Sequence, residues 1–292
     1  MKKNKIAKKV AESIVSDIKS SNLFKLVSSS FKALFKRWPL LFASILVDFL
    51  FIFFLTGAAF LINLKLIEKA TALMQLTGEM TGGMANALGM TTATSITQDA
   101  QFQSLLTSIF KNFLLLVLVS FFLWIIFQGI SWFFAYRMSQ EKNRLPFLIF
   151  WKNFALETIP FYIVYFLTAF ITGLLAFRIG SRTASLLFII ITVLTFYFGS
   201  LCYTITNRYA YQNFKQCFIY GTKKFTKVIQ SILFLIVFFF IIQFVFWIIF
   251  SLTGWALLPG IILIMPAIVF ARILLFKTAA LYWQPKKHVK KK

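Results

Sequence analysis

The sequence predicts an all-α integral membrane protein with six transmembrane helices as three hairpins, each preceded by an amphipathic interfacial helix. Three observations predict this fold. The 292 residues are 60% hydrophobic and 13% charged, whereas soluble domains carry about 25% charged residues. The apolar residues gather in blocks of about 18 or more, the length that spans a bilayer. The Lys and Arg residues lie mainly beside alternate ends of these blocks.

The apolar blocks define six predicted spans and a simple division of the chain. The predicted spans are residues 40–64, 112–136, 159–177, 184–206, 229–252 and 255–276. At about 1.5 Å per residue the third is close to the shortest helix that crosses ~30 Å of hydrocarbon. The division is an arm with an interfacial helix (1–38), a six-span membrane domain (39–283) with an extracytoplasmic insertion (65–111), and a basic tail (284–292).

The positions of Lys and Arg predict the orientation. Of the 31 cations, 26 lie in segments 1–37, 137–158, 207–228 and 272–292, and five lie on the opposite side. The positive-inside rule therefore predicts a protein of the cell membrane with both termini in the cytoplasm. The net charge of +23 favours anionic lipid headgroups as partners, rather than nucleic acid. The candidate phosphate or lipid contacts at the cytoplasmic rim are Arg137, Arg208, Lys223 and Lys224.

Aromatic segments recur before the odd-numbered spans and predict an internal repeat. The first two share the spacing i, i+3, i+4, i+7 and the third keeps its end positions: Phe31, Leu34, Phe35 and Trp38; Phe147, Phe150, Trp151 and Phe154; Phe218 and Phe225. This spacing forms one apolar stripe on a helix, and cations lie beside each segment, which is typical of a helix in the headgroup plane. The segments begin 116 and 71 residues apart. The insertion at 65–111 accounts for the difference.

Two further segments have distinctive patterns. At the N-terminus, Ile6, Val10, Ile14 and Ile18 recur every four residues, which predicts an amphipathic helix that rests on the membrane or docks a partner protein. Glycines in the stretch GEMTGGMANALGM (78–90) predict a loop at the tip of the insertion. The Met residues around this tip come without His or Cys, so we predict no metal site and no cofactor.

One carboxylate, Asp48, lies inside a predicted span. A lone charge at that depth is costly, so we expect a partner. Arg272 in the sixth span lies at a similar depth and is the first choice, ahead of Arg137 and Arg208. The pair would staple the first and last spans or form a solute or proton site; without a partner, Asp48 would stay protonated. Gln128 and Gln243 are the other large polar side chains well inside spans.

These residues lead to three functional hypotheses. The sequence shows no constellation of acids, histidines or nucleophile and base of the kind that enzymes use, which favours a non-enzymatic protein that organises lipid or a partner protein. The alternative is a transporter or channel for a small or anionic solute, which requires Asp48, Gln128, Gln243 and Arg272 to share one cavity. An enzyme acting on phospholipid headgroups would use arginines as phosphate clamps but would lack a nucleophile and a base.

The segments SSSFKALFKRWPLLF and FLIFWKNFALETIPF place basic aromatic helices before apolar hairpins. In this the chain resembles six-span prokaryotic membrane proteins, among them the membrane domain attached to some glycerophosphodiesterases. The resemblance covers the pattern of spans over most of the chain and includes no diagnostic motif. It implies the six-span architecture and no particular activity. The frequent use of Lys and Phe is typical of an AT-rich prokaryotic genome.

Overall fold

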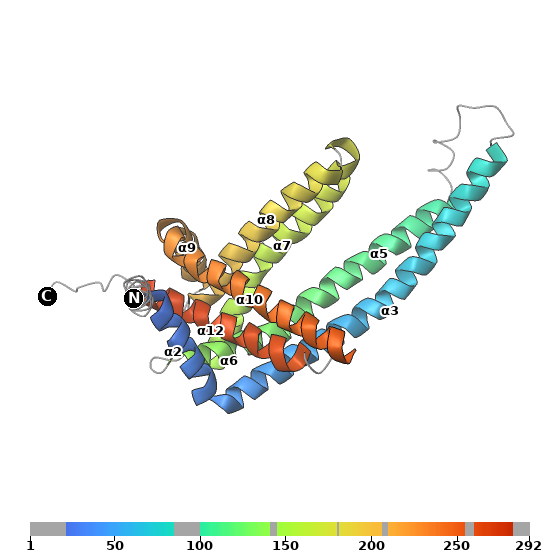
Figure 1. Ribbon diagram of the computed structural model, residues 1–292. Helices are drawn as coiled ribbons and strands as arrows, with labels where there is room; N and C mark the ends of the chain where they lie inside the picture. Colours follow the sequence, from blue (N-terminus) through green and yellow to red (C-terminus); the bar gives the residue numbers. More distant parts are fainter. Residues whose placement is uncertain are drawn as a thin grey trace, which may run out of the picture. The chain divides into compact units, whose positions relative to one another are not determined.

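The fold is described by a computed structural model that covers residues 22–84, 100–140, 145–179, 181–205, 210–254 and 260–282 (Figure 1). These residues form helices and short connections, with no strand among them. Six of the helices are long and apolar enough to cross a membrane. The predicted all-α, multi-pass membrane fold is therefore confirmed.

The helices follow one another with short connections. In chain order they are α2 (Asn22–Lys36), α3 (Trp38–Met84), α5 (Ala100–Leu123), the π-helical turn η1 (Trp124–Gln128), α6 (Gly129–Ser139), α7 (Phe147–Ile179), α8 (Ser181–Thr204), α9 (Ala210–Lys223), α10 (Phe225–Thr253), the π-helical turn η2 (Gly260–Ile264) and α12 (Met265–Tyr282). The candidate spans within them are Trp38–Leu76, Ala100–Ser139, Phe147–Thr172, Arg182–Thr204, Phe225–Leu252 and Gly260–Leu281.

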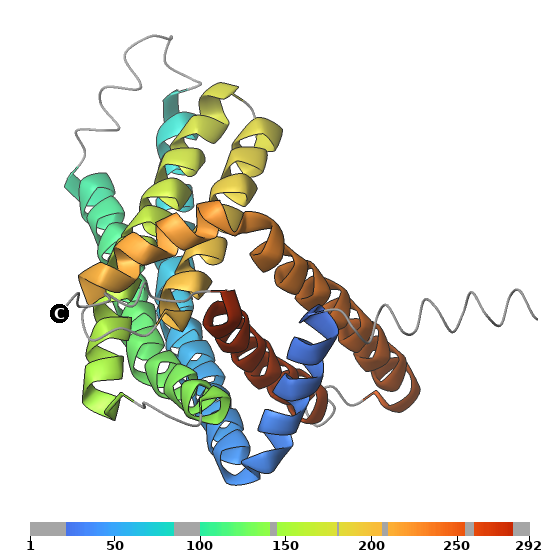
Figure 2. The ribbon, with the colours of Figure 1, turned by 90° about the vertical axis from the view of Figure 1, so that its left-hand side faces the viewer.

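The chain forms two compact units. The first unit comprises Met1–Phe49 and Gln128–Lys292, and the second comprises Leu50–Phe127. In the first unit α12 is the central helix. Half of the most apolar 18-residue stretch of its span is buried, whereas the corresponding share in the other spans is 6–28%. It packs against α2, α6, α8 and α10, and Figure 2 shows α2 and α12 side by side. The core of this unit is therefore built around the last span.

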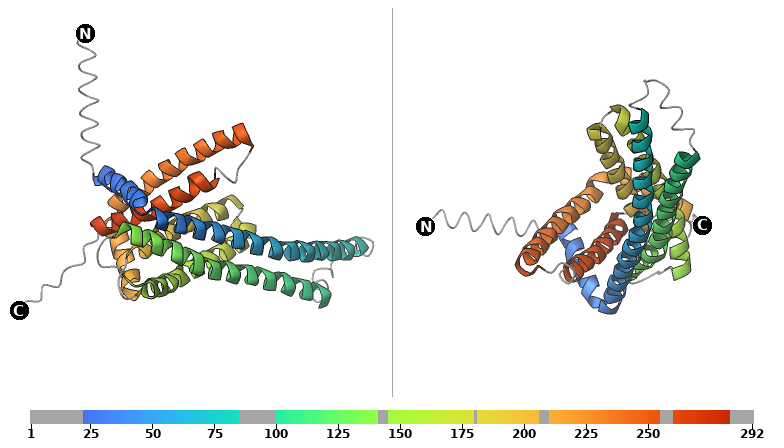
Figure 3. Two further views of the ribbon diagram at one scale, coloured as in Figure 1. Left: turned by 90° about the horizontal axis from the view of Figure 1, so that it is seen from below. Right: turned by 90° about the vertical axis from the view of Figure 1, so that its right-hand side faces the viewer.

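The second unit is a hairpin made by the outer part of α3 and by α5, which run side by side in Figures 1 and 3. Ring pairs join the two helices: Phe51 meets Trp124 edge to face at 5.7 Å, and Phe54 stacks on Phe127 at 5.6 Å between centroids. None of the residues of α5 is buried. Since lipid tails are as apolar as Leu, exposed apolar side chains at membrane depth need no protein partner.

The three segments predicted to be interfacial helices fall on different kinds of helix. The first lies mainly on the short helix α2, and the third runs from the end of the short helix α9 to the start of α10. The segment from Phe147 to Phe154 is instead the first part of α7, which continues through Pro160 to Ile179. Membrane helices tolerate proline because neighbouring groups satisfy the freed carbonyl. The prediction of a separate interfacial helix before the second hairpin is therefore wrong, and the third span begins at Phe147 rather than at 159.

The first hairpin also extends further than predicted. α3 has 47 residues, and at about 1.5 Å per residue it is ~70 Å long, more than twice the hydrocarbon thickness. Its helix continues through part of the predicted glycine-rich tip and ends at Met84. The rest of that tip, the N-terminal arm, the basic tail and Arg208 lie outside the described residues.

Candidate functional site

The acid of the first span meets the arginine of the last. Arg272 on α12 donates from Nη1 to Oδ2 of Asp48 at 2.7 Å and from Nη2 to Oδ1 at 3.0 Å. Both side chains are buried, with 7% of the Arg272 side chain and 4% of that of Asp48 exposed. Two parallel charge-assisted bonds are the strongest geometry for such a pair. The ion pair expected from depth matching is therefore present.

Residues of the second span complete the surroundings of this pair. Arg272 Nη2 also donates to Oε1 of Gln128 at 2.7 Å, and Gln128 Nε2 donates to Oδ1 of Asp48 at 3.3 Å. Arg272 Nη1 donates to the hydroxyl of Ser131, which lies 2.8 Å from the Ser44 hydroxyl. We call Ser44, Asp48, Gln128, Ser131 and Arg272 the polar cluster. All five belong to the first unit and join α3, η1, α6 and α12.

Helical spacing explains why these side chains converge. Ser44 and Asp48 are four residues apart on α3, and Gln128 and Ser131 are three apart at the start of α6, so each pair shares one face of its helix. The π-helical turn η1 ends at Gln128. Such turns insert one extra residue and so rotate the face that follows. The helix face that points toward α12 is therefore rotated at η1, beside the ion pair.

The cluster neutralises its own charges. Both oxygens of Asp48 accept bonds from Arg272, and the guanidinium also lies 5.7 Å from the centroid of the Trp132 ring. A buried ion pair costs desolvation, and that cost is recovered only when the geometry is good and the remaining donors are bonded. Those conditions hold here, so the cluster is suited to fixing three spans together.

The fourth polar candidate of the sequence lies elsewhere. Gln243 is on α10, and its side chain is exposed rather than directed into the polar cluster. Three of the four candidates, Asp48, Gln128 and Arg272, are thus brought together and Gln243 is not. The single cavity lined by all four, which the transport hypothesis required, is not formed by the described residues.

The rim cations are spread over several elements. The Arg137 guanidinium lies 5.7 Å from the centroid of the Phe133 ring. The backbone carbonyl of Arg137 accepts a hydrogen bond from the Arg37 guanidinium. Lys223 and Lys224 are exposed where α9 meets α10. The Arg272 guanidinium already binds the carboxylate of Asp48 and so does not offer these donors to a phosphate group. A headgroup clamp made of Arg137 and Arg272 is therefore not supported by these contacts.

The structure adds a second buried acid, which lies outside the spans that the sequence predicts. Glu157 lies on α7 with 3% of its surface exposed, and Asn213 of α9 donates its amide to Glu157 Oε1 at 2.6 Å. It was missed because α7 was expected to begin at 159. A usable signal exists, since Asn153 and Glu157 are four residues apart between aromatic residues. Ser44 lies four residues before Asp48 and offers the same kind of signal, whereas Ser131, which was also missed, does not.

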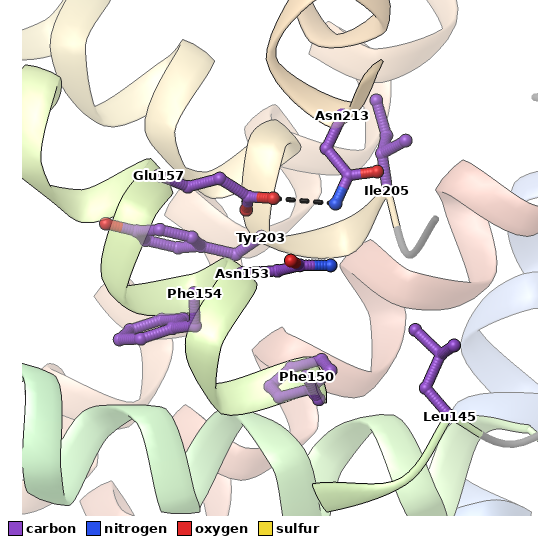
Figure 4. A pocket seen from close by; sticks show the side chains of 8 residues that line it. All are labelled: Leu145, Phe150, Asn153, Phe154, Glu157, Tyr203, Ile205 and Asn213. Carbon is purple, nitrogen blue, oxygen red and sulfur yellow. Dashed lines mark hydrogen bonds between the residues drawn. The ribbon is translucent and has the colours of Figure 1, made fainter. Parts of the chain in front are cut away.

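Glu157 borders a small pocket at the end of the α7/α8 hairpin, where α9 packs across both helices (Figures 2 and 4). Its lining residues are Leu145, Phe150, Asn153, Phe154, Glu157, Tyr203, Ile205 and Asn213. Its free space is about that of one water molecule. A large organic solute would therefore not fit this pocket.

The helices α8 and α9 beside this pocket each carry a cysteine. Cys202 and Cys217 are both buried and free, and the Cys217 thiol donates to the Phe198 carbonyl at 2.9 Å. Among the described residues no three His, Cys, Asp or Glu gather as metal ligands.

In comparisons with known proteins, no family model, no curated protein and no solved structure matches the chain. The resemblance to the membrane domain of some glycerophosphodiesterases therefore stays a prediction from the sequence.

Proposed function

We propose that the chain is a non-enzymatic, multi-pass protein of a prokaryotic cell membrane that organises lipids or a partner protein, with both termini in the cytoplasm. The observation that carries the proposal is the polar cluster. Enzymes and proton-coupled carriers need ionisable groups that contact a substrate or pass on a proton. Asp48 and Arg272 instead hold each other between three spans, which is a scaffolding arrangement.

The short helix α2 supports a role at the headgroup layer. Leu26, Ser30 and Leu34 are buried along one face. Phe35 of α2 is 68% exposed and Trp38, the first residue of α3, is 62% exposed, and both lie beside cationic residues. Basic and aromatic side chains on one exposed face are typical of helices that lie at the interface. Such a face fits anionic lipid headgroups.

α2 is also fixed to the protein core, so its position is defined. Phe31 stacks on Phe270 of α12 with centroids 4.2 Å apart, and Lys277 donates to the Ser29 carbonyl at 2.6 Å. An interfacial helix that is anchored in this way would hold bound lipids in a fixed relation to the spans. The three-unit repeat belongs to the same proposal, with α2 and α9 as the corresponding interfacial helices of the first and third units.

The proposal is tested by identifying what the purified protein retains. We expect mass spectrometry of detergent-purified protein to find anionic phospholipids enriched over the bulk membrane, or a pull-down to find a partner protein. Replacing Lys223 and Lys224 with Gln should reduce the lipid enrichment by roughly thirtyfold, since each of the two cations near the surface contributes ~1 kcal/mol. The matched control replaces Lys65 and Lys69, cations on the opposite side, and should leave the enrichment unchanged.

Three results would contradict the proposal: no enriched lipid and no partner, an equal loss of enrichment in both double variants, or solute flux into proteoliposomes that Asp48→Asn abolishes. The last result would support the alternative, a transporter for a small solute. The observation that favours this alternative is Glu157, a buried acid beside a small pocket whose free space is about that of one water molecule.

A further inference from the structure

The two buried acids of the described chain differ in their partners. Asp48 has an arginine at 2.7 Å. Glu157 instead accepts a hydrogen bond from the side-chain amide of Asn213. In the part of the chain that the structure describes, no Lys or Arg nitrogen lies within ion-pairing distance of Glu157. A buried carboxylate without a cation is costly, so a cation supplied from outside would stabilise it.

The pocket beside Glu157 has the chemistry of a small cation site. Figure 4 shows the Glu157 carboxylate and the carboxamides of Asn153 and Asn213 converging on one space. Aromatic rings form much of the remaining wall, with Phe154 and Tyr203 packed at 4.5 Å between centroids and Phe150 beside them. Carboxylate and carboxamide oxygens accept hydrogen bonds from a cation, and ring faces attract it.

The size of the pocket narrows the choice of cation. Its free space is about that of one water molecule, and the nitrogen of a primary ammonium group with its three N–H donors is of similar size. Divalent metals take six or more oxygen ligands, which exceeds what three polar side chains supply. A quaternary ammonium group is larger and has no N–H to donate.

We propose that the Glu157 pocket binds a primary ammonium group, with Glu157 as counter-ion and Asn153 and Asn213 as hydrogen-bonding partners. The pocket lies where α9, a proposed interfacial helix, packs on the end of α7 and α8. In the proposed topology this position is at the depth of the lipid headgroups. The ammonium therefore comes either from an aminophospholipid headgroup, in which case the inference rests on the proposed lipid-organising function, or from a free amine.

The test measures thermal unfolding of the purified full chain in phosphatidylcholine nanodiscs at fixed pH and ionic strength. Ethanolamine hydrochloride should raise the unfolding midpoint of the wild type in a saturable way, because a ligand that binds only the folded state stabilises it. Tetramethylammonium and potassium chloride should have no such effect. Glu157→Gln should lose the response, while Glu68→Gln, which removes an exposed acid, should keep it.

A second arm separates the two sources of the ammonium group. If it belongs to a lipid, nanodiscs that contain phosphatidylethanolamine should raise the midpoint of the wild type but not that of Glu157→Gln. If free amine alone acts, only dissolved ethanolamine should do so. Asn153→Ala keeps the Glu157–Asn213 hydrogen bond and should weaken the response to ethanolamine, which provides a second variant if Glu157→Gln does not fold.

The proposal is overturned if neither form of ethanolamine stabilises the wild type, or if Glu157→Gln responds as strongly as the wild type. An equal response to potassium would assign the pocket to an inorganic cation instead. These outcomes are separate from the lipid enrichment that depends on Lys223 and Lys224, so a failure here leaves the proposed function to its own test.

Discussion

At the scale of single residues, two glycines allow close helix contacts that no other residue would permit. A Cβ on Gly129 would lie 2.8 Å from Cδ1 of Trp151, and a Cβ on Gly221 would lie 2.8 Å from Cε1 of Phe198. Real Cβ atoms do not approach other atoms so closely, and cores resist added volume. Each of these glycines therefore sets the distance between two helices, α6 and α7 in one case and α9 and α8 in the other.

Gly129→Ala and Gly221→Ala should each destabilise the protein by about 1–3 kcal/mol through overpacking. The measurement is the midpoint of thermal unfolding in detergent. Gly57→Ala is the matched control, because no atom lies within 4 Å of its added Cβ and alanine favours a helix over glycine by ~1 kcal/mol. Equal midpoints for all three variants would show that the close contacts carry no stability.

Single residues also show what the sequence can and cannot predict. The Asp48–Arg272 pair could be predicted because intramembrane charges need partners and depth follows from residue count. Ser131 could not, since a serine in an apolar helix has many possible partners and gives no depth signal of its own. Glu157 was not singled out, because it lies just before the predicted span 159–177 and an acid outside a span needs no partner.

At the scale of elements, α9 is held on the second hairpin by polar contacts as well as by packing. The Tyr197 hydroxyl on α8 donates to the Gly221 carbonyl at 2.9 Å, and Asn213 donates to Glu157 on α7. Tyr197 is buried with Leu201, Cys217 and Tyr220 in one apolar group. Because buried carbonyls without donors are costly, these bonds fix where α9 crosses the hairpin.

Tyr197→Phe should therefore destabilise the protein by ~1 kcal/mol or more, since it leaves the Gly221 carbonyl without this donor. Tyr165→Phe is the control, because Tyr165 is 43% exposed and its described contact is the ring pair with Phe188. The two variants are compared by their unfolding midpoints. If both change equally, the hydroxyl of Tyr197 does not position α9.

The boundaries of elements were harder to predict than their existence. Long apolar blocks predicted six spans, and six are present. The aromatic stripe from Phe147 to Phe154 fits both an interfacial helix and the first turns of a span, because i, i+3, i+4, i+7 spacing describes any buried helix face. Only the packing of α7 against α6 and α8 decides between them, and a single sequence does not contain that information.

At the scale of the whole molecule, the proposed topology places the insertion at 65–111, between the first two spans, outside the cell. A single cysteine introduced as Ala85→Cys should react with a membrane-impermeant maleimide on intact cells. The native Cys202 and Cys217 are buried with no exposed surface, so they should give little background label. Labelling of the introduced cysteine only after lysis would reverse the orientation.

The polar cluster makes a prediction for the molecule as a whole, because it joins the first, second and last spans. Removing one member of a buried pair leaves an uncompensated charge and costs about 3–5 kcal/mol, whereas replacing both with apolar residues is often neutral. Asp48→Leu and Arg272→Met should thus each lower stability strongly, and the combined variant should recover most of the loss. Their non-additivity reports the coupling between the two side chains.

The central claim, that Asp48 and Arg272 form a structural pair, is tested most directly by this double-mutant cycle in thermal unfolding of the purified protein. The account predicts low unfolding midpoints for both single variants, a midpoint near that of the wild type for the double variant, and retained lipid or partner binding by the double variant. A double variant as unstable as the sum of the single ones, or one that is stable but has lost that binding, would contradict it.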